Sequence, residues 1–328
     1  MRDRCHPAPA PGLPVKVLTA VGSIFDVAAG NAQTKTANFG LIMSVADIRL
    51  GLYEKALPPS LSWHERLSAA RELGYAFMEM SIDETDQRLA RLDWTRDERR
   101  ALRLLVEDSG LAIPSICLSA HRRFPFGSAD PAQRERAGEI MLKAIDLAQA
   151  LGVRTLQLAG YDVYYEPSTP DSLARFRDGL AWSADLASAA QVMLAVEIMD
   201  RPLMGSITKW LAWKRDIPTP WFQVYPDLGN LSAWGANVSD ELERGLGHIV
   251  AVHVKDTRPP AGSDPGQFKC VPFGDGCVDF AAAFAALKRL GYRGAFLVEM
   301  WAEASVDPRG AAAAARRFVL GKLEEADW

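Results

Sequence analysis

Four polar side chains that can bind a metal ion stand at or near the ends of short apolar runs. They are Glu197, Asp227, His253 and Glu299, in residues 194–200, 222–230, 250–256 and 297–301, respectively. Burying several carboxylates together costs several kcal/mol for each unless a cation compensates their charge. Three carboxylates and one imidazole that converge would suit one divalent ion, such as Mn²⁺, Mg²⁺, Zn²⁺ or Co²⁺. Each residue alone could instead be hydrogen-bonded to the backbone or paired with a lysine, so the prediction depends on the four meeting.

Short apolar runs that alternate with helical segments supply the elements that would position these residues. The predicted strands are rich in Val, Ile, Leu, Phe and Met, as buried parallel strands are. They comprise residues 48–53, 76–81, 112–119, 155–159, 192–198, 222–225, 249–254 and 296–300. The segments between several of them have apolar residues three and four apart, which predicts amphipathic helices at 63–73, 97–109, 133–151 and 171–190.

Glycines mark where several of these helices should end. Gly74, Gly110, Gly152 and Gly291 each stand between a helical segment and the next strand, where a left-handed residue is needed. The repeated unit of helix, glycine and strand predicts a single-domain (β/α)8 TIM barrel over residues 44–328. An open doubly wound sheet is the alternative, but the sequence has no GxGxxG after its first strand and no phosphate-binding GxxxxGK[ST].

The first 43 residues differ in composition from the rest. They are rich in Pro, Ala, Gly and Thr, and their weak apolar stretch is interrupted by Lys16 and Asp26. We expect residues 1–43 to be a disordered tail, or sequence upstream of a natural start at Met43, rather than a signal peptide.

Composition limits the classes of partner. The chain is 48% hydrophobic and 24% charged with a net charge of −4, so it can bury a sizeable core but offers no basic field for nucleic acid. No apolar run reaches the roughly 18 residues of a membrane span. The four cysteines lack the spacing of a disulfide scaffold or a zinc finger. We therefore expect a cytoplasmic protein with no nucleic-acid or membrane partner, and a homodimer as the commonest assembly.

Several longer motifs resemble one enzyme family. They are Gly51-Leu-Tyr-Glu-Lys-Ala-Leu-Pro58, Glu79-Met-Ser-Ile-Asp-Glu-Thr-Asp86, Arg91-Leu-Asp-Trp94, Leu118-Ser-Ala-His-Arg-Arg-Phe-Pro125, Gln157-Leu-Ala-Gly-Tyr-Asp-Val-Tyr-Tyr165, Tyr225-Pro-Asp-Leu-Gly-Asn-Leu-Ser-Ala-Trp234 and His248-Ile-Val-Ala-Val-His-Val-Lys-Asp-Thr257. Together they resemble the L-ribulose-5-phosphate 3-epimerase (L-xylulose-5-phosphate 3-epimerase) family of L-ascorbate and L-xylulose catabolism, within the xylose-isomerase-like barrels. The likeness covers nearly all of the chain beyond the first 43 residues.

The resemblance implies a cytoplasmic isomerase that inverts C3 of a ketopentose 5-phosphate. It implies that Glu197, Asp227, His253 and Glu299 hold the metal, and that Glu197 and Glu299 are also the acid and base. Two departures stand out: residues 1–43 are extra, and the connection at residues 258–267 is longer than expected.

The two-base assignment also has a physical argument. Inversion beside a carbonyl requires loss of a weakly acidic proton, an enediolate, and return of a proton to the opposite face. A single base would tend to return the proton where it found it. Glu197 and Glu299, on the fifth and eighth predicted strands, could flank one carbon, and general acid/base transfer would contribute roughly 10²- to 10⁴-fold in rate.

Several further residues are predicted to bind substrate. Lys255 and Arg258 follow the predicted ligand at residue 253, and Arg122 and Arg123 follow His121 on another strand-end loop, so either basic pair could meet a phosphate. His121 could equally satisfy a backbone group. Asn230 could bind a sugar hydroxyl or form a turn.

Two other functions use the same residues. A metal-dependent sugar isomerase or lyase would need the same ligands, and a barrel that only binds a sugar phosphate would need no opposed bases. A DNA-repair endonuclease of similar fold would need more histidines for extra metals than the five in the chain.

Overall fold

Eight parallel strands form the centre of the molecule. The computed structural model describes residues 48–328. The strands are β1 (Leu50–Tyr53), β2 (Phe77–Ile82), β3 (Ala112–Leu118), β4 (Thr155–Ala159), β5 (Met193–Glu197), β6 (Phe222–Tyr225), β7 (Ala251–Val254) and β10 (Ala295–Val298). Their order in the sheet is β6-β5-β4-β3-β2-β1-β10-β7. Isolated parallel bridges, Val224 to Ile249 and Asp227 to His253, join the two ends of this sheet. The predicted (β/α)8 barrel is therefore confirmed.

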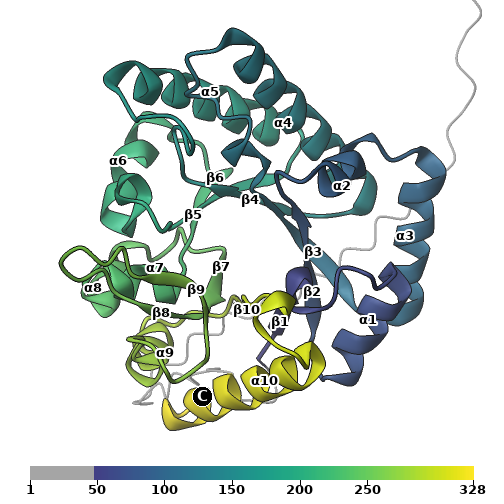
Figure 1. The fold of residues 1–328 in the computed structure, drawn as a ribbon, viewed down its shortest axis with the longest axis vertical. Helices are drawn as coiled ribbons and strands as arrows, with labels where there is room; N and C mark the ends of the chain where they lie inside the picture. Colours follow the sequence, from purple (N-terminus) through teal and green to yellow (C-terminus); the bar gives the residue numbers. More distant parts are fainter. Residues whose placement is uncertain (1–47) are drawn as a thin grey trace, which may run out of the picture. The chain divides into compact units, whose positions relative to one another are not determined.

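The helices surround these strands as an outer ring (Figure 1). They are α1 (Trp63–Glu72), α2 (Asp86–Leu89), α3 (Arg96–Ser109), α4 (Pro131–Leu151), α5 (Pro170–Ala189), α6 (Ile207–Asp216), α7 (Leu228–Ala233), α8 (Val238–Arg244), α9 (Phe280–Arg289) and α10 (Pro308–Glu325). Among residues 48–328, none of the helices combines the length and the apolar character needed to cross a membrane.

Local sequence fixes where the helices begin and end. Helix α3, for example, begins with a capping box in which Thr95 and Glu98 satisfy each other's backbone N–H groups. It ends at Gly110, which has a φ of 67°. All four glycines predicted to end helices have positive φ angles.

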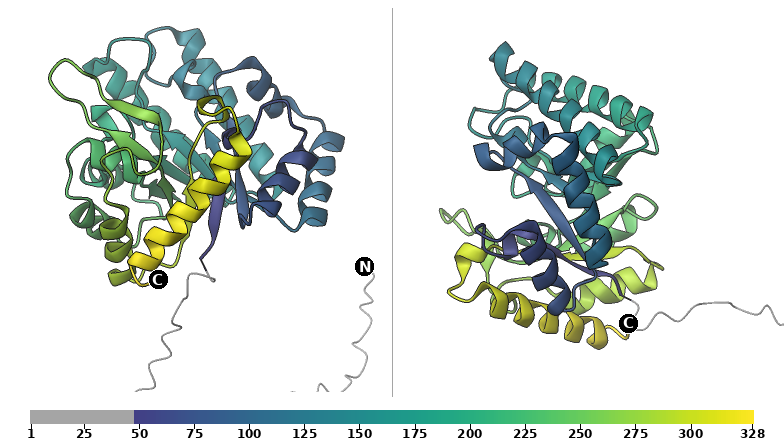
Figure 2. Two further views of the ribbon diagram at one scale, coloured as in Figure 1. Left: turned by 60° about the horizontal axis from the view of Figure 1, so that its bottom comes forward. Right: turned by 90° about the vertical axis from the view of Figure 1, so that its right-hand side faces the viewer.

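The last helix completes the ring beside the first helix. The backbone carbonyl of Ala312 in α10 accepts a hydrogen bond from the hydroxyl of Tyr75, and Arg316 donates to the carbonyl of Gly74. Figure 2 shows α10, in yellow, running alongside the first part of the barrel. Because β1 also pairs with β10, the two ends of the described chain meet on this side.

A short antiparallel ribbon replaces a simple loop after β7. Strand β8 (Asp256–Arg258) pairs with β9 (Gln267–Val271), and Ala261 bridges to Asp264 between them. The sequence predicted only a long connection at residues 258–267. The predicted parallel strands and helices agree with the observed elements to within one or two residues at most ends. The prediction about residues 1–43 lies outside the described residues.

Candidate metal centre

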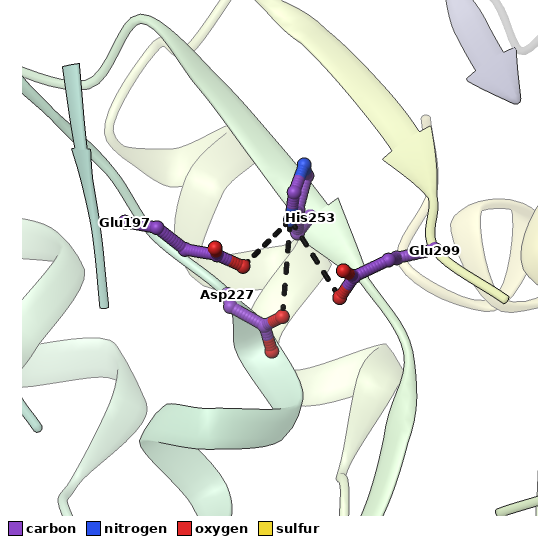
Figure 3. Close-up of side chains that lie close together, drawn as sticks. All are labelled: Glu197, Asp227, His253 and Glu299. Atoms are coloured by element: carbon purple, nitrogen blue, oxygen red, sulfur yellow. Dashed lines mark hydrogen bonds and ion pairs between the residues drawn. The ribbon is translucent and has the colours of Figure 1, made fainter. Parts of the chain in front are cut away.

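The four predicted ligands meet at one mouth of the barrel. Glu197 is the last residue of β5, Asp227 precedes α7, His253 lies in β7, and Glu299 follows β10. All four are buried, and one ligand atom from each lies within 4.8 Å of the others. Figure 3 shows the three carboxylates pointing at the imidazole from three sides. The spatial arrangement on which the metal prediction depends is therefore present.

The closure of the barrel brings two of these ligands together. Asp227 and His253 form one of the bridges that join β6 to β7. Asp227 Oδ1 accepts the backbone N–H of Asn230 at 2.8 Å and so caps α7, which fixes the direction of the carboxylate. The other oxygen, Oδ2, is buried and faces the ligand cluster, where its nearest positive group is the ammonium of Lys255 at 2.8 Å.

Distances around the imidazole fit one small cation. His253 Nδ1 lies 2.9 Å from Glu197 Oε1, 3.7 Å from Glu299 Oε2 and 3.9 Å from Asp227 Oδ2. Ligands bound at about 2.0–2.2 Å to one ion would lie roughly 3.0–4.4 Å apart. The donor set, its burial and its spacing therefore fit a divalent metal ion.

Lys255 places one positive charge against two of the carboxylates. Its Nζ lies 2.8 Å from Asp227 Oδ2 and 2.9 Å from Glu299 Oε2, and the lysine is itself buried. Burial acts to raise the pKa of Glu299, but the positive charges of Lys255, His253 and Lys269 together lower it to about 2. Burial raises the pKa of Asp227 in spite of the same ammonium. Lys255 thus favours an ionised Glu299.

The imidazole is held in a field of negative charge. Burial alone would lower the pKa of His253, but the carboxylates of Glu197 and Glu299 raise it well above the usual value. Positive charge at this position is strongly favoured, which is also what a bound cation would supply.

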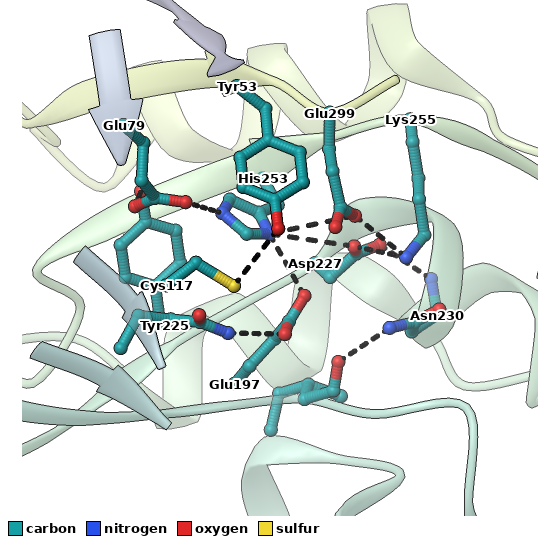
Figure 4. Close-up of polar contacts among 12 residues, drawn as sticks. Tyr53, Glu79, Cys117, Glu197, Tyr225, Asp227, Asn230, His253, Lys255 and Glu299 are labelled. Atoms are coloured by element: carbon teal, nitrogen blue, oxygen red, sulfur yellow. Dashed lines mark hydrogen bonds and ion pairs between the residues drawn. The ribbon is translucent and has the colours of Figure 1, made fainter. Parts of the chain in front are cut away.

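Two buried polar residues behind the ligands were missed by the sequence analysis. Glu79 on β2 lies in the barrel interior. Its Oε1 is 3.1 Å from Nε2 of His253, within hydrogen-bond distance. Gln157 on β4 donates to Glu197 Oε2. Figure 4 shows Glu79 on the side of the imidazole away from Asp227. A charged or amide residue inside a predicted apolar strand is the signal that could have found both.

Two of the residues predicted to bind substrate have other partners. His121 Nε2 lies 3.1 Å from the carbonyl oxygen of Ala137 in α4, and its ring stacks on Phe126. Asn230 Nδ2 donates to the carbonyl of Ile198 at 2.7 Å. Both side chains are buried. Both contacts join neighbouring elements. For His121 this is the backbone contact that the sequence left open, whereas the contact of Asn230 with β5's flank is neither the sugar contact nor the turn that the sequence offered.

The predicted basic residues are not brought together. Lys255 lies among the ligands, whereas Arg258 is exposed on β8. The guanidinium of Arg122 lies over the rings of Tyr161 and Tyr164. Its central carbon is 5.5 Å from the ring centre of Tyr161 and 5.4 Å from that of Tyr164. Burial disfavours the charge of Arg122, but the neighbouring Tyr161 and the Asp200 carboxylate raise its pKa.

Two cavities lie beside this end of the barrel. One, of about 420 Å³, has Lys255 and Glu299 on its wall together with apolar side chains of β9 and α10. The other, of about 700 Å³, lies between the turn joining β8 to β9 and the loops that contain Tyr164 and Asp200. A small organic substrate therefore has space next to the ligands.

Known proteins resemble this chain over most of its length. The sequence profile of the family described as xylose isomerase-like TIM barrel matches residues 67–321. The L-ribulose-5-phosphate 3-epimerase UlaE of Salmonella paratyphi C (strain RKS4594) is 56% identical over 279 residues, which cover 85% of this chain and 96% of that protein. The chain belongs to the L-ribulose-5-phosphate 3-epimerase family of xylose isomerase-like TIM barrels. UlaE of Escherichia coli O157:H7 (strain EC4115 / EHEC) is 55% identical over 279 residues, which again cover 85% of this chain and 96% of that protein.

Solved structures show that the fold of this epimerase family extends to more distant proteins. An L-ribulose 3-epimerase superposes with a TM-score of 0.68 at 24% identity, over 85% of this chain and 96% of that one. A D-allulose 3-epimerase from Methylomonas sp. gives a TM-score of 0.68 at 19% identity, over 84% and 98%. At these identities the likeness concerns the fold alone.

Proposed function

We propose that this chain is a metal-dependent 3-epimerase that interconverts L-ribulose 5-phosphate and L-xylulose 5-phosphate. The observation that carries the proposal is the meeting of Glu197 and Glu299, from strands on either side of β6 and β7, at one buried cluster of metal ligands. The family and the printed activity of relatives more than half identical to this chain support the choice of substrate.

The chemistry requires a proton to leave one face of C3 and another to reach the opposite face. Glu197 and Glu299 approach the same imidazole nitrogen from different strands, so a substrate carbon between them would have a carboxyl group on each side. One carboxylate would take the proton while the other, protonated, returns one. A divalent ion held by the four side chains would supply Lewis-acid stabilisation of negative charge on the substrate oxygens.

Neighbouring residues prepare the two glutamates for these roles. Lys255 keeps Glu299 ionised, as a base must be before it accepts a proton. Gln157 holds one oxygen of Glu197 and leaves Oε1 facing the cluster. Because the carboxylates of this cluster interact, their protonation states belong to the set as a whole.

Other proposed roles concern substrate contacts, assembly and location. Arg122 and Lys255 are the proposed substrate contacts among the predicted basic residues, since one stands beside Asp200 and the other on a cavity wall. Arg258, His121 and Asn230 complete the proposed set of substrate contacts. We also propose a cytoplasmic location and a role in L-ascorbate catabolism, which the family resemblance implies, and a homodimer, which is the commonest assembly.

Exchanging each glutamate for its amide tests the proposal. Glu197→Gln and Glu299→Gln proteins should keep the wild-type circular dichroism spectrum but lose epimerisation by at least about 10²-fold, the scale of one acid/base group. Interconversion of the two pentulose 5-phosphates is measured with added divalent metal. Glu107→Gln, an exposed change in α3, is the matched control and should retain full activity. Substantial activity in either active-site variant would refute the two-base assignment.

A solvent-isotope experiment separates epimerisation from the alternatives. In deuterated water, the wild-type product should carry deuterium at C3, because the proton that is returned comes from an exchangeable carboxyl group. Turnover without label at C3 would favour an isomerase that shifts hydride. Substrate binding without turnover would favour a barrel that only binds the sugar phosphate.

A further inference from the structure

A fifth buried carboxylate lies behind the candidate metal centre. Glu79 stands in the middle of β2 and is fully buried inside the barrel. Its Oε2 accepts hydrogen bonds from Ser115 Oγ at 2.6 Å and from Tyr225 OH at 3.3 Å. Its Oε1 lies 3.1 Å from His253 Nε2. Both oxygens are therefore engaged, and neither is free to bind a cation.

The two nitrogens of His253 face different partners. Nδ1 faces the carboxylates of Glu197, Asp227 and Glu299, whereas Nε2 faces Glu79 (Figure 4). With a cation in the ligand cluster the imidazole would be neutral and carry one proton, and the hydrogen bond at one nitrogen decides which nitrogen has a free lone pair. A carboxylate at Nε2 places the proton there and leaves the lone pair of Nδ1 directed at the ligand cluster.

We propose that Glu79 is a positioning residue for the metal centre, which fixes the tautomer and ring orientation of His253 so that Nδ1 is the ligand atom. This inference rests on the proposed metal centre and adds to it. Carboxylates that accept the outer N–H of a ligating histidine also increase its strength as a donor.

The barrel holds Glu79 firmly in this position. Ser115 is the register partner of Glu79 in the neighbouring strand β3, so its hydroxyl lies beside the carboxylate. Tyr225, at the end of β6, reaches the same oxygen from another side, and its ring packs edge-on against the imidazole at 4.5 Å between ring centres. The donors at Oε2 thus aim Oε1 at His253.

Cobalt binding tests the inference without relying on activity. Metal-stripped wild-type, Glu79→Gln and Glu79→Leu proteins are titrated with Co²⁺ alone, in competition with a chelator of known affinity. The visible absorption of bound Co²⁺ reports the geometry of its ligands. We expect Glu79→Leu to bind Co²⁺ about 10- to 100-fold more weakly with an altered spectrum. Glu79→Gln keeps an acceptor but loses the charge, so it should show a smaller loss and a spectrum close to wild type.

The controls separate positioning from a purely structural role. Ser183→Ala removes another buried serine hydroxyl, which donates only to a helix carbonyl, and it should leave Co²⁺ affinity unchanged. Folded Glu79→Leu and Glu79→Gln proteins that bind Co²⁺ within twofold of wild type with the same spectrum would overturn the inference. If Glu79→Leu fails to fold, Glu79→Gln decides alone: weaker binding supports the inference and unchanged binding overturns it.

The same titration distinguishes this inference from the proposed function. If the wild-type protein binds no Co²⁺, or if Glu197→Gln binds it as tightly as wild type, the metal centre itself is wrong. If the wild type binds and Glu197→Gln does not, but both Glu79 variants bind normally, only the role of Glu79 fails.

Discussion

Removing the charge of Lys255 should destabilise the metal-free protein far more than the metal-loaded one. Its Nζ lies within 2.9 Å of oxygens from Asp227 and Glu299, and the side chains of all three are at least 93% buried. Loss of one partner from a buried ion pair typically costs about 3–5 kcal/mol. With an unfolding entropy of roughly 0.6 kcal/mol/K for a chain of this size, Lys255→Met should lower Tm by about 5–8 °C in the presence of a chelator.

A bound divalent ion should reduce this loss. The two positive charges of the ion would neutralise much of the carboxylate charge that Lys255 and His253 offset in the metal-free protein. Excess Mn²⁺ should therefore shrink the Tm difference between Lys255→Met and wild type to less than half its metal-free value.

Thermal unfolding followed by circular dichroism, with and without metal, measures both effects. Lys143→Met removes an exposed lysine paired with Asp93 at 2.5 Å, and as a surface pair it should cost no more than about 1 kcal/mol. If Lys255→Met lowers Tm no more than Lys143→Met does under chelation, or if metal leaves the difference unchanged, the electrostatic account of the cluster is refuted.

Other predictions concern groups away from the ligands. Burial lowers the pKa of His121 to about 4, so the unfolded state binds the proton more readily and stability should fall as pH drops from about 6.5 to 4. The free energy of unfolding should be lower by about 2 kcal/mol at pH 5 than at pH 7.5. Urea unfolding at both pH values should show a smaller difference for His121→Gln than for the wild type. A Cβ at Gly127 would lie 2.4 Å from the backbone oxygen of Asp162, so Gly127→Ala should cost about 1–3 kcal/mol. Gly321→Ala, where nothing lies within 4 Å, should instead stabilise helix α10 by about 0.5–1 kcal/mol.

The barrel and its four metal-binding side chains could be predicted from the sequence because both depend on local patterns. Apolar runs, helical periodicity and terminal glycines define units that only a few architectures can accommodate. Strand ends in such a barrel face one mouth, so Glu197, Asp227, His253 and Glu299 could be predicted to meet.

The remaining features depend on distances across the barrel interior. Glu79 is 174 residues from His253 in sequence, and nothing in the spacing of either residue indicates that they are in contact. Lys255 was predicted to meet substrate or phosphate, but the structure sets its charge between two carboxylates. The sequence predicts only a connection where β8 and β9 form a ribbon. The two strands are short, and residues 258–267 between them are rich in proline and glycine, which are typical of loops.

The central claim is that four side chains from separate strand ends hold one cation. Anomalous diffraction at the zinc edge, from crystals of the chain grown with Zn²⁺, tests it most directly. We predict one strong peak about 2.0–2.2 Å from His253 Nδ1 and from an oxygen of each of Glu197, Asp227 and Glu299. Absence of a peak among these side chains, or an ion bound by fewer than all four of them, would contradict the account.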